Sequence, residues 1–228
     1  MPSLSPLIVF DLDGTLVDTA DDLIAALNHV LTREGAAPVA PGAARSMVGH
    51  GARMLISRGL ASQDRSVSPE RLEDLFQAFL AFYNEHIAVH SKIFPGVPEA
   101  LDALAAQGFA LGVCTNKYEA ASRRLLGLMG LADRFRIICG QDTFAFCKPD
   151  PRTLLATIQA AAGDAKTSIM VGDSRTDIDT AKAAGVPVIA VDFGYTDQHV
   201  SAFGPDMVIS HYNEIVGAVA HLRARALA

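Results

Sequence analysis

Short apolar runs alternate with longer amphipathic stretches over most of the chain. The runs are rich in β-branched residues and are continuously apolar, as in strands that are covered on both faces. The predicted strands are 7–10, 110–115, 136–139, 168–172, 186–191 and 207–209. The predicted helices are 96–107, 119–129, 151–162, 176–184 and 213–225, and left-handed glycine caps are expected at Gly108, Gly163 and Gly185. This alternation indicates an α/β fold in which helices cover both faces of a parallel sheet.

The region 18–91 breaks the alternation. It holds helical patterns but no convincing strand, and the predicted helices are 21–34, 43–60 and 69–90. We expect it to form a smaller α-helical domain inserted after the first strand, with 1–17 and 92–228 forming the larger domain. Because the chain enters and leaves the insertion at neighbouring points, we expect a hinged lid.

Composition narrows the classes of function. Half of the 228 residues are apolar, the net charge is −6, and no run of Lys and Arg exceeds two residues, which argues against a nucleic-acid partner. The apolar run Leu7–Phe10 is too short for a signal peptide, and no stretch approaches the length of a membrane helix. We expect a cytoplasmic monomer or homodimer without a membrane partner, whose three cysteines are reduced and mostly buried.

Polar side chains follow four of the predicted strands, at the edge where open parallel sheets bind ligands. They are Asp11 and Asp13 after the first strand, Thr115, Asn116 and Lys117 after the second, Lys148 after the third, and Asp173 and Asp177 after the fourth. Carboxylates this close repel one another unless a cation compensates them, and Mg²⁺ prefers such oxygen ligands. The hydroxyl, amide and ammonium groups are suitable donors to phosphoryl oxygens.

These residues belong to four motifs that resemble those of the haloacid dehalogenase superfamily. The motifs are Asp11-Leu12-Asp13-Gly14-Thr15-Leu16, Thr115-Asn116-Lys117, Lys148-Pro149-Asp150-Pro151 and Gly172-Asp173-Ser174-Arg175-Thr176-Asp177. Within the superfamily the chain is similar to the phosphoglycolate phosphatase group, over essentially its whole length and without departure at a motif position. The resemblance implies a Rossmann-like core with an α-helical cap, and a magnesium-dependent phosphatase that acts on a small phosphorylated metabolite.

The resemblance also implies a role for each motif residue. Asp11 would be the nucleophile that forms an aspartyl-phosphate. Asp13 would protonate the leaving alcohol and then take a proton from the hydrolytic water. Lys148 would neutralise the nucleophile and the transferring group, and Thr115 and Asn116 would bind the phosphoryl oxygens.

For the metal, the resemblance implies that Mg²⁺ binds to Asp11, the backbone carbonyl of Asp13, and Asp173. Asp177 would either support these ligands or be a further ligand. Two alternatives remain open for Lys117, a role at this edge of the sheet and a surface or cap-facing role.

Three other reactions of the superfamily can be weighed against the sequence. Haloacid dehalogenases lack a carboxylate at the position of Asp13, which is present here. Phosphonate hydrolysis uses a cap lysine, and 16–91 contains no lysine. A β-phosphoglucomutase-like phosphomutase shares the Asp11 and Asp13 pair and stays a less favoured alternative.

Substrate choice depends on the cap, where Gly49, His50, Gly51 and Arg53 form the most informative segment. Glycines on both sides of His50 let a backbone approach a ligand, and Arg53 can bind a carboxylate in bidentate fashion. The segment is similar to one in phosphoglycolate phosphatases, which favours 2-phosphoglycolate. Arg45 is a weaker candidate for the same task. Sugar phosphates or a broad range of monoesters are the alternatives, and a solvated Arg53 at a flexed helix junction remains open.

Overall fold

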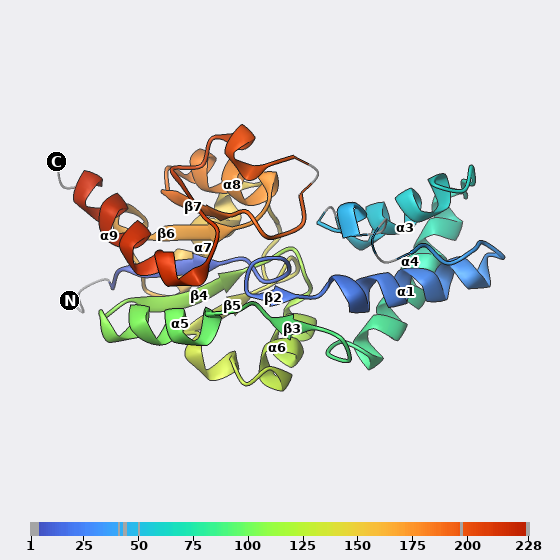
Figure 1. The fold of residues 1–228 in the computed structure, drawn as a ribbon, viewed down its shortest axis with the longest axis horizontal. Coiled ribbons are helices and arrows are strands. Elements are labelled where there is room, and N and C mark those ends of the chain that lie inside the picture. The colour runs from blue at the N-terminus through green and yellow to red at the C-terminus, as the bar shows by residue number, and fades with distance from the viewer. Residues whose placement is uncertain (1–4, 41, 43–44, 50, 197, 227–228) are drawn as a thin grey trace. The chain divides into compact units, whose positions relative to one another are not determined.

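The structure of the protein is a computed structural model (Figure 1). It describes residues 5–40, 42, 45–49, 51–196 and 198–226. The chain folds into two compact units, of which one is Met1–Val17 with Ile93–Ala228 and the other is Asp18–Lys92. The short strands β2 (Val17–Asp18) and β3 (Lys92–Ile93) pair where the chain passes between the units.

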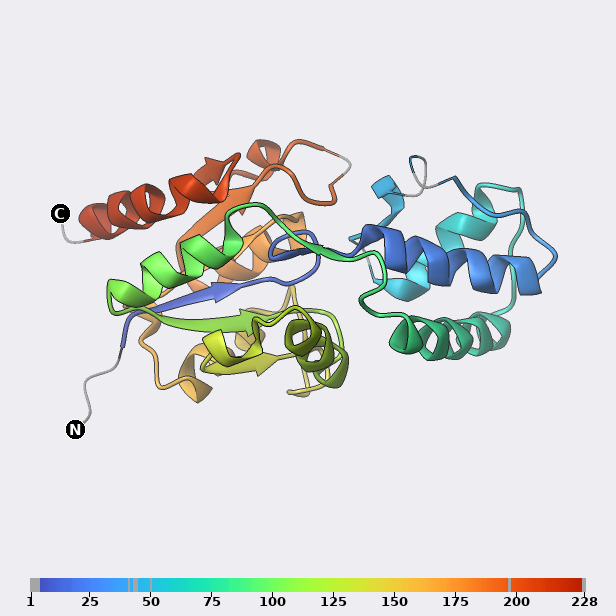
Figure 2. The same ribbon diagram turned by 60° about the horizontal axis from the view of Figure 1, so that its bottom comes forward.

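The larger unit is built on a six-stranded sheet in which every neighbouring pair is parallel. Its strands are β1 (Leu7–Phe10), β4 (Ala110–Cys114), β5 (Ile137–Cys139), β6 (Ile169–Gly172), β7 (Val188–Val191) and β8 (Met207–Ile209). The order across the sheet is β5-β4-β1-β6-β7-β8, which puts β1 between β4 and β6 (Figure 2). All residues of β1, β4, β6 and β7 are buried, as their continuously apolar sequences predict.

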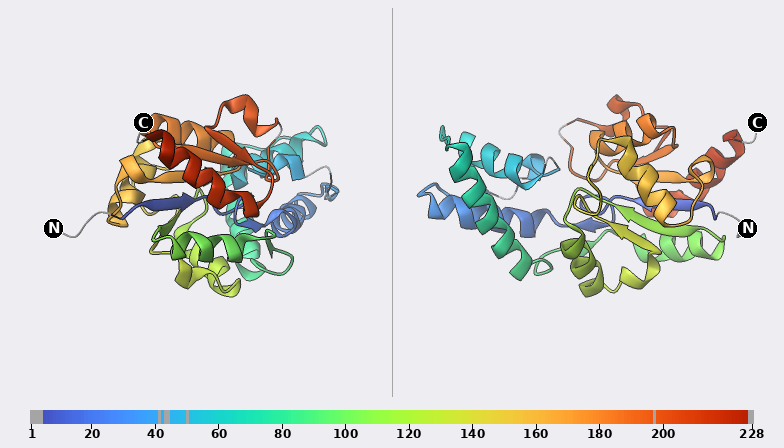
Figure 3. Two further views of the ribbon diagram at one scale, coloured as in Figure 1. Left: turned by 60° about the vertical axis from the view of Figure 1, so that its left-hand side comes forward. Right: turned by 180° about the vertical axis from the view of Figure 1, so that it is seen from behind.

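Helices cover both faces of this sheet (Figure 3). They are α5 (Val97–Ala106), α6 (Glu119–Leu128), α7 (Pro151–Ala160), α8 (Arg175–Ala184) and α9 (Ile215–Ala226). α7 packs against α8 on one side, and α5 packs against α9 on the other. The predicted α/β fold is therefore confirmed.

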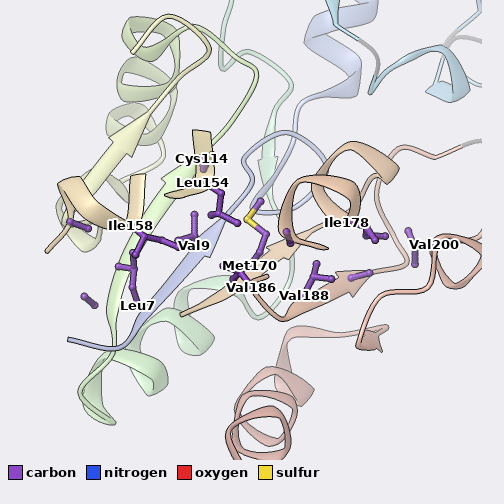
Figure 4. Packing of buried hydrophobic residues seen from close by; sticks show 14 residues of the cluster. Leu7, Val9, Cys114, Leu154, Ile158, Met170, Ile178, Val186, Val188 and Val200 are labelled. Carbon is purple, nitrogen blue, oxygen red and sulfur yellow. The ribbon is translucent and has the colours of Figure 1, made fainter. Parts of the chain in front are cut away.

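Apolar side chains fill the space between the sheet and the helices α7 and α8. Figure 4 shows Leu7 and Val9 of β1 on the same side as Leu154 and Ile158 of α7 and Met170 of β6. The intervening residues of β1 point to the opposite face, since side chains alternate along a strand. This packing fixes β1 in the middle of the sheet, and with it the loop that follows.

The predicted helix ends are confirmed at two of three glycines. Gly185 caps α8 with a φ of 67°, and Gly108 follows the end of α5 with a φ of 85°. The prediction for Gly163 is wrong, because the left-handed residue after α7 is Ala162, with a φ of 53°.

Among its described residues, the smaller unit contains α1 (Ala20–Arg33), a 3-10 helix (Arg45–Met47), α3 (Ala52–Ala61) and α4 (Pro69–Glu85). The prediction of one helix over 43–60 is wrong, because Gly49 and Gly51 adopt φ values of 99° and 83° and interrupt it. α4 also ends earlier than predicted. No helix among the described residues is both long and apolar enough to cross a bilayer.

The buried carboxylate of Asp22 ties the two ends of the smaller unit together. Asp22 lies near the start of α1 and accepts hydrogen bonds from the backbone N–H groups of His90 (2.9 Å) and Ser91 (2.8 Å). The hydroxyl of Ser91 donates a third bond of 2.6 Å. This contact holds the two chain ends of the unit side by side.

Candidate active site

The loops that follow β1, β5 and β6 bring three predicted residues into direct contact. Nζ of Lys148 lies 2.9 Å from Oδ1 of Asp11 and 2.5 Å from Oδ1 of Asp177. Asp11 follows β1 directly, Lys148 lies after β5, and Asp177 lies in the first turn of α8. A parallel sheet presents the carboxyl ends of these strands at the same edge, so distant segments of sequence form one ionic cluster.

Asp11 is a buried carboxylate, with 8% of its surface exposed. Its backbone N–H donates to the carbonyl oxygen of Val171 (2.8 Å), which fixes the residue beside the end of β6. Burial raises the pKa of Asp11 to about 6; the charge of Lys148 lowers it, and those of Asp177 and Asp13 raise it. Oδ1 lies 2.9 Å from Nζ of Lys148 as an ion pair and makes no hydrogen bond with the described residues. This oxygen can therefore accept a further ligand.

Three carboxylates at this edge could hold a metal ion. Asp11, Asp173 and Asp177 each offer an oxygen, and these oxygens lie within 4.8 Å of one another. Burial raises the pKa of Asp173 well above its usual range, and the charges of Asp177 and Asp11 raise it further. Such a buried group of like charges needs a cation, and its oxygen donors suit Mg²⁺. The residues present therefore fit the magnesium ion that the sequence predicts.

Asp177 is tightly held by other protein groups. Its Oδ2 accepts hydrogen bonds from the backbone N–H (3.1 Å) and the hydroxyl (2.6 Å) of Ser174, and its Oδ1 binds Lys148. A side chain at Gly172 would collide with it, since a Cβ there would lie 2.5 Å from Cγ of Asp177. Of the two roles predicted for Asp177, these bonds favour support of the metal ligands.

Lys148 carries its positive charge in a buried position, with 4% of its surface exposed. Burial alone would lower the pKa of this ammonium, but Asp11 and Asp177 raise it above its usual value. Asn116 holds the backbone here: its Nδ2 donates to the carbonyl oxygen of Lys148 (2.9 Å), and its Oδ1 accepts from the N–H of Lys148 (3.0 Å). The side-chain amide of Asn116 thus positions the lysine, a use that the sequence did not predict.

Thr115 and Lys117 lie in the loop after β4. Thr115 is 2% exposed, and its hydroxyl oxygen accepts a hydrogen bond from the N–H of Lys117 (3.2 Å). Nζ of Lys117 lies 2.9 Å from both carboxylate oxygens of Asp13. The side chain of Lys117 is 6% exposed, so it is not at the surface, and its contact with Asp13 places it at this edge of the sheet.

The carboxylate of Asp173 is held by residues to which the sequence analysis assigned no role. Oδ2 accepts a hydrogen bond from the backbone N–H of Tyr195 (2.7 Å), and Oδ1 accepts one from the hydroxyl of Thr15 (3.0 Å). Gly194 provides the space for this side chain. One signal could have found them, because Gly194 and Tyr195 follow the predicted strand 186–191 at the same edge of the sheet.

The predicted substrate-binding segment of the smaller unit is only partly described. Gly49 and Gly51 have the positive φ values given above, and His50 lies outside the described residues. Arg53 makes a bidentate pair with Glu73, through Nε (2.9 Å) and Nη2 (3.1 Å), and its guanidinium lies 3.5 Å above the ring of Phe76.

Arg45, the weaker candidate for binding a substrate carboxylate, also has an acidic partner within the smaller unit. Its Nη2 lies 2.6 Å from Oδ2 of Asp18. Both arginines therefore have an acidic partner inside the smaller unit.

Known proteins resemble the chain over nearly its whole length. A family model for haloacid dehalogenase-like hydrolases matches residues 8–191. A protein from Mesorhizobium japonicum named phosphoglycolate phosphatase is 51% identical over 221 residues, which are 97% of each chain. Another of that name, from Agrobacterium fabrum, is 45% identical over 95% of this chain and 93% of its own.

A solved structure of another protein is similar to this chain in its fold. A predicted phosphoglycolate phosphatase from Haemophilus somnus has a TM-score of 0.86 and 27% identity, over 96% of this chain and 99% of that one. The family predicted from the four motifs is confirmed by the family model and by both relatives. The chain is an enzyme that belongs to the haloacid dehalogenase-like hydrolase family.

Proposed function

We propose that the protein is a magnesium-dependent phosphomonoester hydrolase that acts on 2-phosphoglycolate through an aspartyl-phosphate intermediate. The relatives named phosphoglycolate phosphatase support this substrate. The observation that carries the chemistry is the buried Asp11, which lies against Lys148 and beside two further carboxylates. A buried nucleophilic carboxylate beside a fixed cation suits attack on an anionic phosphoryl group.

In the first step a carboxylate oxygen of Asp11 attacks phosphorus. The bond from this oxygen to phosphorus forms as the bond from phosphorus to the alcohol oxygen breaks, and Asp13 gives its proton to that alcohol oxygen. Lys148 offsets the charge on Asp11 and on the phosphoryl group. Thr115 would bind a phosphoryl oxygen through its hydroxyl, and Asn116 through its backbone N–H, since its side chain is bonded to Lys148.

In the second step the ionised Asp13 takes a proton from a water molecule. The water oxygen attacks phosphorus, the bond from phosphorus to Asp11 breaks, and inorganic phosphate leaves. Asp13 ends this step protonated and Asp11 ends it as a free carboxylate, so the enzyme is ready for another substrate molecule.

Mg²⁺ would be held by Asp11, the backbone carbonyl of Asp13, and Asp173, with Asp177 as a support. When bound there, the ion supplies positive charge to the phosphoryl oxygens. Thr15 and the backbone of Tyr195 orient Asp173, so that a carboxylate oxygen is ready for the ion.

The inserted region 18–91 would be the cap of a catalytic core formed by 1–17 and 92–228. Its segment from Gly49 to Arg53 is the proposed site of substrate selection. In the structure the guanidinium of Arg53 is paired with Glu73 through Nε and Nη2, which leaves Nη1 to meet a substrate carboxylate. Because Glu73 offsets the charge of Arg53, the pairing also supports a second candidate, a phosphatase that accepts a broad range of monoesters.

A panel of phosphomonoesters, assayed by phosphate release, tests both candidates. Asp11→Asn is expected to lose activity on every substrate, and EDTA to abolish wild-type activity until Mg²⁺ is restored. Arg53→Ala is expected to lose activity on 2-phosphoglycolate and to keep it on neutral esters, while Arg58→Ala, on the same helix, matches wild type. Equal losses on acidic and neutral esters would remove Arg53 as a substrate ligand, and an active Asp11→Asn would contradict the mechanism.

A further inference from the structure

Lys117 is the second buried lysine at the carboxyl edge of the sheet, and it binds the second aspartate of the first loop. Its side chain is 6% exposed, whereas that of Asp13 is 22% exposed. Nζ stands at 2.9 Å from both Oδ1 and Oδ2, so one ammonium bridges the carboxylate. Asp11 lies in the same loop as Asp13, and it contacts Lys148. Each of the two proposed catalytic aspartates therefore has a buried lysine of its own.

The backbone of Lys117 is fixed from two directions. Its N–H donates to the hydroxyl oxygen of Thr115 (3.2 Å), and its carbonyl oxygen accepts the N–H of Gln141 (3.0 Å). Gly140 allows this close approach, because a Cβ at that position would lie 2.6 Å from the carbonyl oxygen of Lys117. The loop after β5 thus packs directly against the loop that carries the lysine.

Side chains of the loop after β5 reinforce this contact. The carboxylate of Asp142 accepts the N–H of Glu119 (2.8 Å), and the hydroxyl of Thr143 donates to the carboxylate of Glu119 (2.5 Å). Thr143 also accepts the N–H of Gly140 (2.8 Å). These bonds hold the start of α6 and leave little freedom to the residues before it, so the long side chain of Lys117 starts from a fixed position.

We propose that Lys117 is the residue that positions Asp13 for proton transfer, an inference that rests on the proposed function. Nζ reaches both carboxylate oxygens, so Lys117 can hold either oxygen while the other faces the leaving alcohol or the water.

This role predicts a dependence on the leaving group. An alkoxide needs a proton as it departs, so its release depends on where Asp13 is held. A p-nitrophenolate departs without a proton, so its release in the first turnover does not depend on where Asp13 is held. Hydrolysis of the aspartyl-phosphate needs Asp13 as a base whatever the first substrate was.

The test compares wild type, Lys117→Met and Lys166→Met in single turnovers with Mg²⁺ present. Lys166 is exposed, and its substitution is expected to match wild type. For Lys117→Met we expect an about 10²-fold slower release of alcohol from 2-phosphoglycolate and ethyl phosphate, but an about 5-fold or smaller change in the p-nitrophenolate burst. The steady-state rate on p-nitrophenyl phosphate should also fall, because the second step limits it.

A double variant separates positioning from direct substrate binding. If Lys117 acts only through Asp13, then Asp13→Ala with Lys117→Met is no slower than Asp13→Ala alone in steady-state turnover of p-nitrophenyl phosphate. Additive losses would overturn the proposal. A loss confined to 2-phosphoglycolate would overturn it too, since ethyl phosphate has the same kind of leaving group but no carboxylate.

Separate controls test whether the variants fold and whether the proposed function is correct. Thermal unfolding checks that Lys117→Met is folded, and if it is not, Lys117→Gln, which keeps a donor, repeats the comparison. Equal losses in the single-turnover release of the alkyl alcohols and of p-nitrophenolate, in either folded variant, would contradict the positioning role. An active Asp11→Asn would instead contradict the proposed function, so the two failures are distinguishable.

Discussion

A single methyl group at Gly194 should weaken metal binding by displacing the carboxylate of Asp173. A Cβ at this position would lie 2.5 Å from Cγ of Asp173, whereas carbon atoms in contact stand about 3.5 Å apart. The carboxylate must therefore move by roughly 1 Å. The backbone of Gly194 lies outside the left-handed region, so Gly194→Ala costs little in the backbone itself and the steric conflict falls on Asp173.

The size of the effect follows from the two bonds that hold Asp173. It accepts a hydrogen bond from the N–H of Tyr195 (2.7 Å) and another from the hydroxyl of Thr15 (3.0 Å). A hydrogen bond to a charged group contributes about 1.5–3 kcal/mol, so losing one is equivalent to about a 10- to 100-fold change in affinity. We expect the Mg²⁺ concentration for half-maximal phosphate release to rise by that factor.

The assay is phosphate release from 2-phosphoglycolate as a function of Mg²⁺ concentration. Gly127→Ala is the matched control, because a Cβ at Gly127 meets no atom within 4 Å. Saturating Mg²⁺ should restore most of the rate of Gly194→Ala. The reasoning would be refuted if this variant kept its unfolding temperature and needed no more Mg²⁺ than wild type.

Two further predictions concern stability. Burial, together with the charges of Asp177 and Asp11, raises the pKa of Asp173, so the folded state favours its protonated form and loses stability as pH rises above about 4. In EDTA at pH 7, Asp173→Asn should therefore unfold at a higher temperature than wild type, and the gap should shrink below pH 4; a pH-independent gap would be evidence against this. Asp22→Asn places an amide where three donors converge, and should lower the free energy of unfolding in urea by about 2 kcal/mol, whereas the exposed Asp21→Asn should leave it unchanged.

The sequence predicts the sheet and the edge at which the site lies, because both follow from local patterns. Continuous apolar runs such as Leu7–Phe10 mark buried parallel strands, and residues that follow such strands meet at one edge. Asp11, Lys148 and Asp177 come together there for that reason. The topology of the fold brings them together across more than half of the chain.

The contacts that the sequence did not predict involve backbone groups or partners that are distant in the sequence. Tyr195 serves Asp173 through its N–H, and Gly194 by lacking a side chain, so neither shows catalytic chemistry in the sequence. The partner of Arg53 is Glu73, 20 residues away on another helix, and no local pattern links them. The bridge from Lys117 to Asp13 joins loops 104 residues apart. Such contacts are fixed by tertiary packing and not by local propensity.

The central claim is that Asp11 carries the phosphoryl group between substrate and water. Rapid mixing of the enzyme with 2-phosphoglycolate and Mg²⁺, followed by an acid quench and peptide mass spectrometry, tests it most directly. We predict one added phosphoryl group on the peptide that contains Asp11, formed and lost at rates that account for turnover, and absent from Asp11→Asn. Turnover without any phosphorylated peptide, or phosphorylation of another residue, would contradict the account.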